Sequence, residues 1–264
     1  MHIHRNTMAG WRLGAAAALL SGLLAGCGGG GGGSDERTTS GLVPAAPTPG
    51  ATLFADATLL RPLVPGASWS YSGTDPNGTT YTNVVTHAAS SPGVLESYTN
   101  TFGQGAGSTH VAALNGNIVQ PDPADVDGDG INDISNAIEL RSPVRVDDQF
   151  VAFDRHLPGF IPDLDGDGHG EALDLAIYSR VIGLEDVVLE SGTISATRVD
   201  HIVAARLVTS KDGQMLPTVS STQSIWYAPS LGIVRQHMDA PADDGLSRLV
   251  SDEKLVDWAG LPGM

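Results

Sequence analysis

Residues 61–75 read Arg-Pro-Leu-Val-Pro-Gly-Ala-Ser-Trp-Ser-Tyr-Ser-Gly-Thr-Asp. Trp69 and Tyr71 alternate with serines, which is the period of a half-buried strand. The stretch leads into Asp75-Pro76-Asn77-Gly78, a hairpin signal in which proline presets φ and Asn-Gly accepts positive φ. A β-branched run from Thr79 to His87 follows. These residues predict an antiparallel hairpin.

The rest of the chain repeats this pattern of short β-rich runs and turn signals, spaced about ten residues apart. A short element at residues 134–140 is also expected, and residues 172–182 fit either a strand face or an Ala-rich helix. No long helix is expected, so we predict a mainly β fold, a curved antiparallel sheet or partial barrel with two inserted acidic loops and few helices. The expected strands are residues 94–102, 108–114, 117–119, 144–154, 187–189, 197–208, 218–227, 233–237 and 247–258.

Two acidic stretches interrupt the pattern at residues 125–133 and 163–171. Each places a carboxylate at every second position and a glycine just after the third carboxylate. Carboxylates packed this closely repel one another, and an apolar core cannot absorb their charge. We therefore expect a cation at both stretches.

The spacing matches the 12-residue calcium loop, which uses side-chain oxygens at positions 1, 3 and 5, glycine at 6 and a carbonyl at 7. Position 9 often acts through water, and position 12 closes the site. In the second loop, residues 163–174, glycine at position 6 is Gly168 and an Asp replaces the usual closing Glu. The predicted ligands of this loop are Asp163, Asp165, Asp167, the carbonyl of His169, Glu171 and Asp174.

The first loop, residues 125–136, follows the same frame only as far as position 9. Its last position is a neutral amide, so we expect weaker binding, an empty site, or closure by Asp122 or Glu139 from outside the loop. The predicted ligands of this loop are Asp125, Asp127, Asp129, the carbonyl of Ile131, Asp133 and Asn136.

Neither loop has the flanking helices of an EF-hand, and prolines precede both. They resemble the Asp-Gly-Asp-Gly calcium loops of thrombospondin type 3 repeats and dockerins. A solvated acidic turn is the alternative, since Asp and Gly both favour turns. Magnesium needs stricter octahedral geometry, and zinc would need more His or Cys than the local His169 offers. We predict two Ca²⁺ sites, the second stronger, at the roughly 10⁻⁴–10⁻³ M affinity of permanently occupied extracellular sites.

The N-terminal region indicates export. Residues 1–26 carry Arg5 and Arg12, then a short apolar run too short to span a bilayer, as in a signal peptide. The run ends in Leu24-Ala25-Gly26-Cys27, which resembles the lipobox of bacterial lipoproteins and implies lipidation of Cys27 and membrane anchoring. An ordinary secretory peptide with an incidental cysteine is the alternative. Gly28, where an Asp would imply inner-membrane retention, favours the outer membrane, facing the periplasm or the cell surface.

Residues 27–51 are rich in Gly, Pro, Thr and Ala and are expected to form a flexible tether. Residues 52–260 are long enough for one β domain, or for two halves, 52–121 and 142–260, around the acidic loops. Loss of residues 1–26 leaves 12 basic and 30 acidic residues, a formal charge of −18. This charge argues against binding nucleic acid or anionic head groups.

A second resemblance rests on the motifs Gly183-Leu-Glu185-Asp-Val187, then Gly192-Thr193, and Trp226-Tyr227-Ala228-Pro229-Ser230-Leu231-Gly232-Ile233-Val234-Arg235. They are similar to motifs of exported, mostly uncharacterised β-rich bacterial proteins, and the segment 63–69 is similar to the opening strand of those proteins. Ser230 stands where that pattern has Gly, which leaves the turn type open. The resemblance implies a curved antiparallel sheet and no activity. We interpret Trp226 and Tyr227 as core residues rather than ligand contacts.

Among the catalytic signatures, Gly-x-Ser-x-Gly, His-Glu-x-x-His and the P-loop are all missing, and the histidines are scattered. We therefore expect no enzyme but a non-catalytic, calcium-binding envelope lipoprotein with a structural or partner-binding role. Carriage of an apolar ligand in a partial β-barrel is the alternative, and a hydrolase is the least favoured function. A deep apolar cavity between Trp69, Phe102 and Trp226 would favour the carrier function, and a filled core would favour the structural role. A cleft with a buried His and carboxylate would favour an enzyme.

Overall fold

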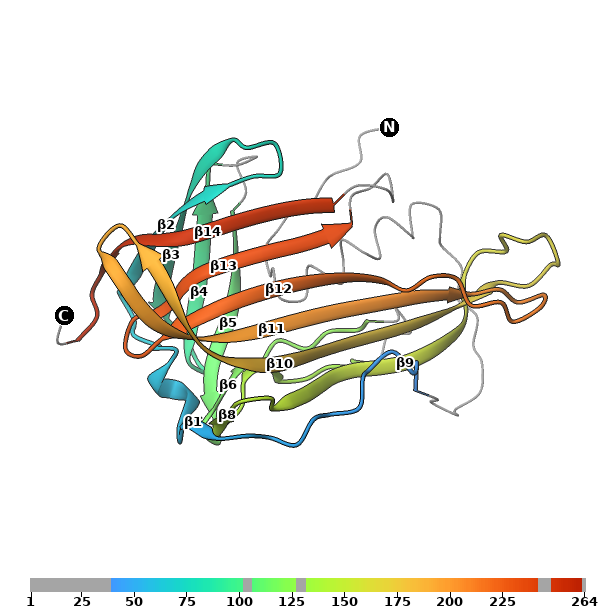
Figure 1. Ribbon diagram of the computed structural model, residues 1–264, viewed down its shortest axis with the longest axis horizontal. Coiled ribbons are helices and arrows are strands. Elements are labelled where there is room, and N and C mark those ends of the chain that lie inside the picture. The colour runs from blue at the N-terminus through green and yellow to red at the C-terminus, as the bar shows by residue number, and fades with distance from the viewer. Residues whose placement is uncertain (1–38, 102–105, 127–131, 242–247, 263–264) are drawn as a thin grey trace.

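The structure, a computed structural model, describes residues 39–101, 106–126, 132–241 and 248–262. Its core is a 12-stranded antiparallel sheet in the order β7-β6-β5-β4-β3-β2-β14-β13-β12-β11-β10-β9, accompanied by a two-stranded sheet of β1 and β8 (Figure 1). The predicted mainly β class is confirmed, and the only helix among the described residues is a 3₁₀ turn, η1, at Ala57–Leu59. No helix within these ranges is long and apolar enough to cross a membrane.

Most strands follow the predicted runs, with boundaries that differ by a few residues. A strand at Thr52–Phe54 was not predicted, the predicted run 144–154 divides at residues 146–148, and residues 187–189 end a strand that begins at Glu171. Those of the first half are β1 (Thr52–Phe54), β2 (Ser68–Thr74), β3 (Thr80–Ala89), β4 (Val94–Asn100), β5 (Ala106–Leu114), β6 (Asn117–Gln120) and β7 (Ala137–Leu140). Those of the second half are β8 (Val144–Arg145), β9 (Gln149–Ile161), β10 (Glu171–Leu189), β11 (Gly192–Val208), β12 (Val219–Ala228), β13 (Gly232–Pro241) and β14 (Arg248–Ala259).

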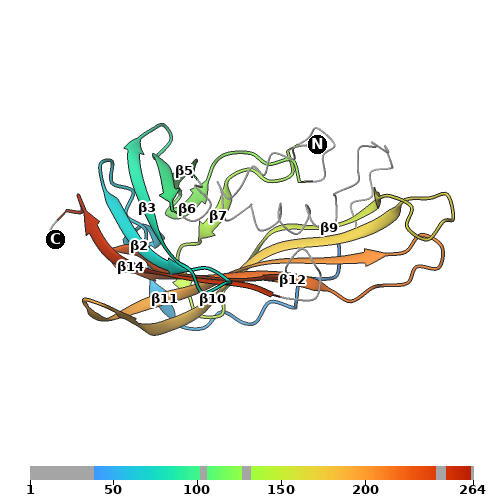
Figure 2. The same ribbon diagram turned by 90° about the horizontal axis from the view of Figure 1, so that it is seen from above.

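The two halves form one continuous sheet because the last strand, β14, pairs with β2, with Trp258 opposite Trp69. The sheet curls so that β5, β6 and β7 lie above the long strands β9 to β12 in the view of Figure 2. Residues from β7 and from β10 to β12 line one hollow together, so the two ends of the sheet approach each other across its concave face. The curl turns an open sheet into an almost closed barrel.

Residues 172–182, which the sequence leaves open between strand and helix, lie within the 19-residue strand β10. Its lateral neighbours are β9 and β11, and residues on both of its faces are buried, such as Leu173 and Ala176. The neighbouring strand β9 runs further than the turn signals in its sequence suggest, since Pro158 and Gly159 lie inside it. β9 is an edge strand, where a missing N–H removes no ladder bond and a glycine at φ +66° fits a bulge.

Residues 39–51, predicted as part of the flexible tether, lie along β9 as an extended segment that we call the strap. Ser40 is 4% exposed, and its backbone N–H donates to Asp154 at 2.9 Å. The Pro44 carbonyl accepts from Gln149, and Gly50 donates to the carbonyl of Val146 at 2.8 Å. Composition alone indicates flexibility, but the hydrogen bonds to β9 and to Val146, just before β9, hold residues 40–50 in place. Residues 27–38 lie outside the described residues.

The core divides into two apolar clusters. The larger one contains Trp69, Tyr71 and Tyr227, and the smaller one contains Phe153 and Leu173, near the acidic loops. Between them the concave face carries a belt of polar side chains, most of them buried. We call this set the polar belt: Asn83, Gln120, His201, Gln223, Gln236 and Glu253.

Residues from the two sequence motifs meet on one face of the sheet. Trp226, 4% exposed, donates from Nε1 to Glu185 at 2.7 Å, and the Arg235 guanidinium lies 4.5 Å from its ring centroid. Arg198 lies 5.3 Å from the same ring centroid. Tyr227, next in sequence, is fully buried and donates to Glu139 at 3.0 Å. The prediction that both aromatics are packing residues is confirmed.

Candidate functional site

The second acidic loop connects β9 to β10 at one end of the long strands, beside the turn between β11 and β12 (Figure 1). Gly166 and Gly168 adopt φ of +79° and +88°, a region that side chains disfavour, so glycine is required at both positions. Their backbone N–H groups donate to the two oxygens of Asp163, at 2.6 and 2.9 Å. These hydrogen bonds hold the pKa of Asp163 below its usual value, so this carboxylate stays charged.

Glu171, at position 9, is the buried member of the loop, with a relative exposure of 0%. Its Oε1 accepts from the N–H groups of Leu164 and Asp165, at 3.0 and 3.2 Å, and its Oε2 accepts from the N–H of Ser210. Burial raises the pKa of Glu171, but these donors outweigh the burial and leave that pKa below its ordinary value. The side chain therefore fastens the loop to the β11–β12 turn as a carboxylate.

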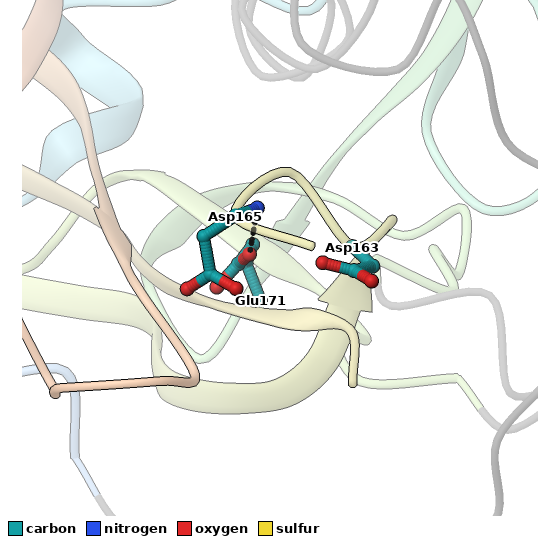
Figure 3. Close-up of side chains that lie close together, drawn as sticks. All are labelled: Asp163, Asp165 and Glu171. Carbon is teal, nitrogen blue, oxygen red and sulfur yellow. Dashed lines mark hydrogen bonds between the residues drawn. The ribbon is translucent and has the colours of Figure 1, made fainter. Parts of the chain in front are cut away.

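The predicted first, third and ninth ligands converge. Oxygens of Asp163, Asp165 and Glu171 lie within 4.8 Å of one another (Figure 3). No Lys, Arg or His side chain among the described residues forms an ion pair with any of them. Their hydrogen bonds come from neutral N–H donors, and the carboxylate oxygens of Asp163 and Asp165 retain lone-pair capacity for a metal. Oxygen-only, charge-dense ligands of this kind fit Ca²⁺.

Asp167, the predicted ligand at position 5, faces the same turn. Its Oδ1 accepts from the Ser210 hydroxyl at 3.0 Å and from the N–H of His169 at 2.8 Å. The N–H of Lys211 donates to Asp165 at 3.3 Å, so with the bond from Ser210 to Glu171 the turn contacts three of the loop carboxylates. The β11–β12 turn is therefore a supporting element that the spacing of the loop itself does not reveal.

Asp174, predicted at position 12, does not join this group. Its carboxylate, with its side chain 4% exposed, accepts from Arg206 at 2.6 Å and lies 2.7 Å from His156 Nδ1. Arg206 also donates to the Ser40 carbonyl of the strap at 3.1 Å. The spacing of the 12-residue calcium loop no longer applies once β10 begins, because the strand directs the Asp174 side chain toward residues of β9 and β11. Asp174 holds the strap rather than the loop.

In the first loop, Asp127, Asp129 and Ile131 lie outside the described residues, as does Cys27. At its base Ala124 and Ile134 form a β-bridge, and Asp133 accepts from the N–H of Val126 at 2.9 Å. Asp125 and Asn136 are exposed, the latter at φ +55°.

The two helpers suggested for this loop point elsewhere. Asp122 lies 3.0 Å from His110 Nδ1. Glu139 is 2% exposed and belongs to the interior. Its partners are Arg61 and Tyr227, so neither carboxylate closes the first loop.

A buried charge cluster lies where the larger apolar cluster meets the polar belt. Arg61, 1% exposed, donates from Nε to Glu139 at 3.2 Å and forms a short ion pair with Glu96. His87 Nε2 lies 3.0 Å from Glu96, and its ring packs at 4.6 Å on Trp69. Burial is the largest influence and lowers the pKa of Arg61, but Glu96 together with Tyr227 and Tyr71 outweighs burial and leaves that pKa raised. Arg61 links β4 and β7 across the barrel and occupies the space between the two glutamates.

Two small hollows, rather than a deep apolar cavity, lie on the concave face within the described part of the chain. One, of about 40 Å³, is lined by Gln120, His201 and Gln223, and the other, of about 60 Å³, by Asn83, Glu96 and Glu253 among others. Trp69 and Trp226 are both buried in the larger apolar cluster, and Phe102 lies outside the described residues. The sequence shows alternation in these strands but not which polar residues would face inward together, so this polar belt was not predicted.

The sequence matches no protein-family model, and no curated protein is significantly similar to it. Two solved structures are similar. A candidate lipoprotein from Parabacteroides distasonis has 17% identity and a TM-score of 0.43, covering 76% of this chain and 98% of that chain. A candidate exported protein with a YmcC-like fold from Bacteroides fragilis has 17% identity and a TM-score of 0.39, covering 76% and 99%. Similarity this low assigns no function.

Proposed function

We propose that the chain is a non-catalytic calcium-binding lipoprotein of the cell envelope, anchored through Cys27, with a structural or partner-binding role. The observation that carries the calcium assignment is the convergence of Asp163, Asp165 and Glu171 within 4.8 Å, without a cationic partner among the described residues. Calcium would neutralise this charge and tie the β9–β10 loop to the β11–β12 turn. Export and lipidation rest on residues 1–27 of the sequence.

Calcium dependence can be measured on the mature protein by thermal melting and limited proteolysis, with Ca²⁺ or with EGTA. We expect EGTA to lower the melting temperature and to speed cleavage near residues 162–170. Asp165→Asn should reproduce this loss in the presence of Ca²⁺, whereas Asp186→Asn, at an exposed acid elsewhere on β10, should not. Unchanged melting and protease resistance in EGTA would refute the calcium assignment.

The alternative, an apolar-ligand carrier, has less support because both hollows are small and border polar side chains. The buried His87–Glu96 contact is the feature that an enzyme would need, but Arg61 and Trp69 pack directly against it. A structural role for this cluster accounts for these contacts, which supports the non-catalytic proposal.

A further inference from the structure

Glu253 on β14 is a buried carboxylate with no cation beside it. It is 4% exposed, and Tyr81 and Asn83 donate to its two oxygens at 2.8 and 3.1 Å. Both donors are neutral, and no Lys, Arg or His side chain in the described part of the chain forms an ion pair with it. Burial raises the pKa of Glu253 despite these two donors. A charge held in this way costs stability, which points to a function for it.

The surroundings of Glu253 are specifically built. Gly73 lies opposite Glu253 in the β14–β2 register and opposite Tyr81 in the β2–β3 register. A Cβ on Gly73 would lie 2.4 Å from Tyr81 Cζ, the atom that carries the hydroxyl. Glycine therefore makes room for the ring that delivers a hydrogen bond to Glu253. Burial, and then the charge of Glu253, raises the pKa of Tyr81, so that this hydroxyl remains a donor.

Glu253 borders the hollow of about 60 Å³, whose lining also includes Asn83, Glu96 and Arg61 beside the apolar side chains of Val85 and Ile233. Asn83 is 8% exposed, and its Oδ1 has no hydrogen-bond partner among the described residues. Glu96 borders the same hollow, where its Oε2 is paired with Arg61. Since one water needs roughly 10–15 Å³ of such a hollow, its volume of about 60 Å³ admits a small terminal group. Half-buried Tyr98 and Gln236 border its outer side.

We propose that this hollow binds the terminal ammonium group of a small primary amine, with Glu253 and the Asn83 Oδ1 as acceptors. An ammonium group supplies a positive charge beside Glu253. It also supplies three N–H donors, which can bond to Glu253 and to the Asn83 Oδ1. An aminomethyl group is small enough for this hollow. Glu253 and Glu96 outnumber Arg61 in its lining, which disfavours an anion. The remainder of the amine would leave past Tyr98 and Gln236.

Ethylamine is a suitable probe, with ethanol and acetate as neutral and anionic controls of similar size. Titration followed by backbone amide NMR of the mature protein should show saturable ethylamine binding at Asn83 and Glu253, and none for ethanol or acetate. Glu253→Gln should weaken ethylamine binding about ten- to a hundred-fold, since it removes a charge-assisted bond. Glu190→Gln, at an exposed acid, should leave it unchanged.

A second measurement uses the wild-type protein alone. Tetramethylammonium has the same charge but no N–H donor and more bulk, so it should not compete with ethylamine. Binding of ethanolamine alone would assign a free amine, and binding of glycerophosphoethanolamine as well would assign a phospholipid head group. Equal shifts with ethylamine and ethanol, or unchanged binding in folded Glu253→Gln, would overturn the proposal and leave the hollow as a water site. These results do not depend on the calcium loops.

Discussion

Asp133 accepts a hydrogen bond from the backbone N–H of Val126 at 2.9 Å, seven residues earlier in the chain. Glu171 and Leu164 repeat this contact at 3.0 Å with the same separation. In both acidic loops the ninth residue therefore closes onto the second. The two loops share this closing hydrogen bond, as their common spacing predicts, although one closes with Asp and the other with Glu.

This shared closure separates the role of charge from the role of the hydrogen bond at Asp133. In Asp133→Asn the amide oxygen still accepts from Val126, so the loop base should stay folded, while one negative charge is lost. We expect calcium affinity at the first loop to fall, with the second loop unaffected. Calorimetric titration of the variant beside Asp165→Asn would measure both. Loss of the stronger, second-loop binding in Asp133→Asn would contradict the assignment of the loops as independent sites.

Asp174→Asn tests whether Asp174 holds the strap or closes the metal site. The change breaks a nearly buried pair with Arg206, so the free energy of unfolding should fall by about 2 kcal/mol. Calcium affinity should not change, because Asp174 lies outside the group of three converging carboxylates. Denaturant unfolding and calcium titration of the same variant give both quantities. A tenfold weaker calcium affinity with unchanged stability would restore Asp174 as the closing ligand.

Ser230→Gly should stabilise the protein. Ser230 is exposed at φ +64°, where a side chain costs roughly 1–2 kcal/mol of backbone strain. Glycine removes this strain, but it loses more conformational entropy on folding than serine does, which offsets part of the gain. The net gain expected is about 0.5–1 kcal/mol, measured by denaturant unfolding. The backbone N–H of Ser230 donates to the Leu59 carbonyl at 2.9 Å and is kept in the variant. Ser230→Ala, which keeps the strain, is the control and should show no gain.

Glu253→Gln should make the protein more stable at neutral pH, by on the order of 1 kcal/mol. Because folding raises the pKa of Glu253 above its ordinary 4.5, its favourable contribution is complete below about that pH. It is lost as the pH rises through the folded pKa, where the buried carboxylate must ionise. The difference between variant and wild type should thus shrink on acidification toward pH 4.5. If the wild type were more stable than Glu253→Gln at pH 7, the negative charge of Glu253 would have to be compensated within the folded protein.

The fold class could be predicted because strand alternation and turn residues are local signals. What alternation does not encode is which distant strands pair. The junction of β2 with β14 depends on contacts between residues near opposite ends of the chain, such as Trp69 and Trp258. The strap was misjudged for a similar reason: its Pro- and Thr-rich composition lacks periodicity, and its order comes from Asp154 and Arg206 on distant strands.

The convergence of Asp163, Asp165 and Glu171 in the second acidic loop could be predicted because the loop geometry is local, set by two glycines and the short spacing of the acids. Asp174 failed to follow because strand pairing begins at Glu171 and overrides the loop frame. The hollow at Glu253 could not be predicted, since its residues come from β3, β4, β13 and β14 and share no motif.

The strap also bears on how the isolated domain would behave. β9 is an edge strand of 13 residues, and an exposed edge of that length is a template for pairing with another chain. Ser40 and Pro44 place a non-pairing, proline-containing segment along it. The stretch that reads as a passive spacer thus covers part of the sheet beside this edge. We expect a recombinant domain cut at residue 52, which lacks these contacts, to self-associate more readily than one that begins at residue 39.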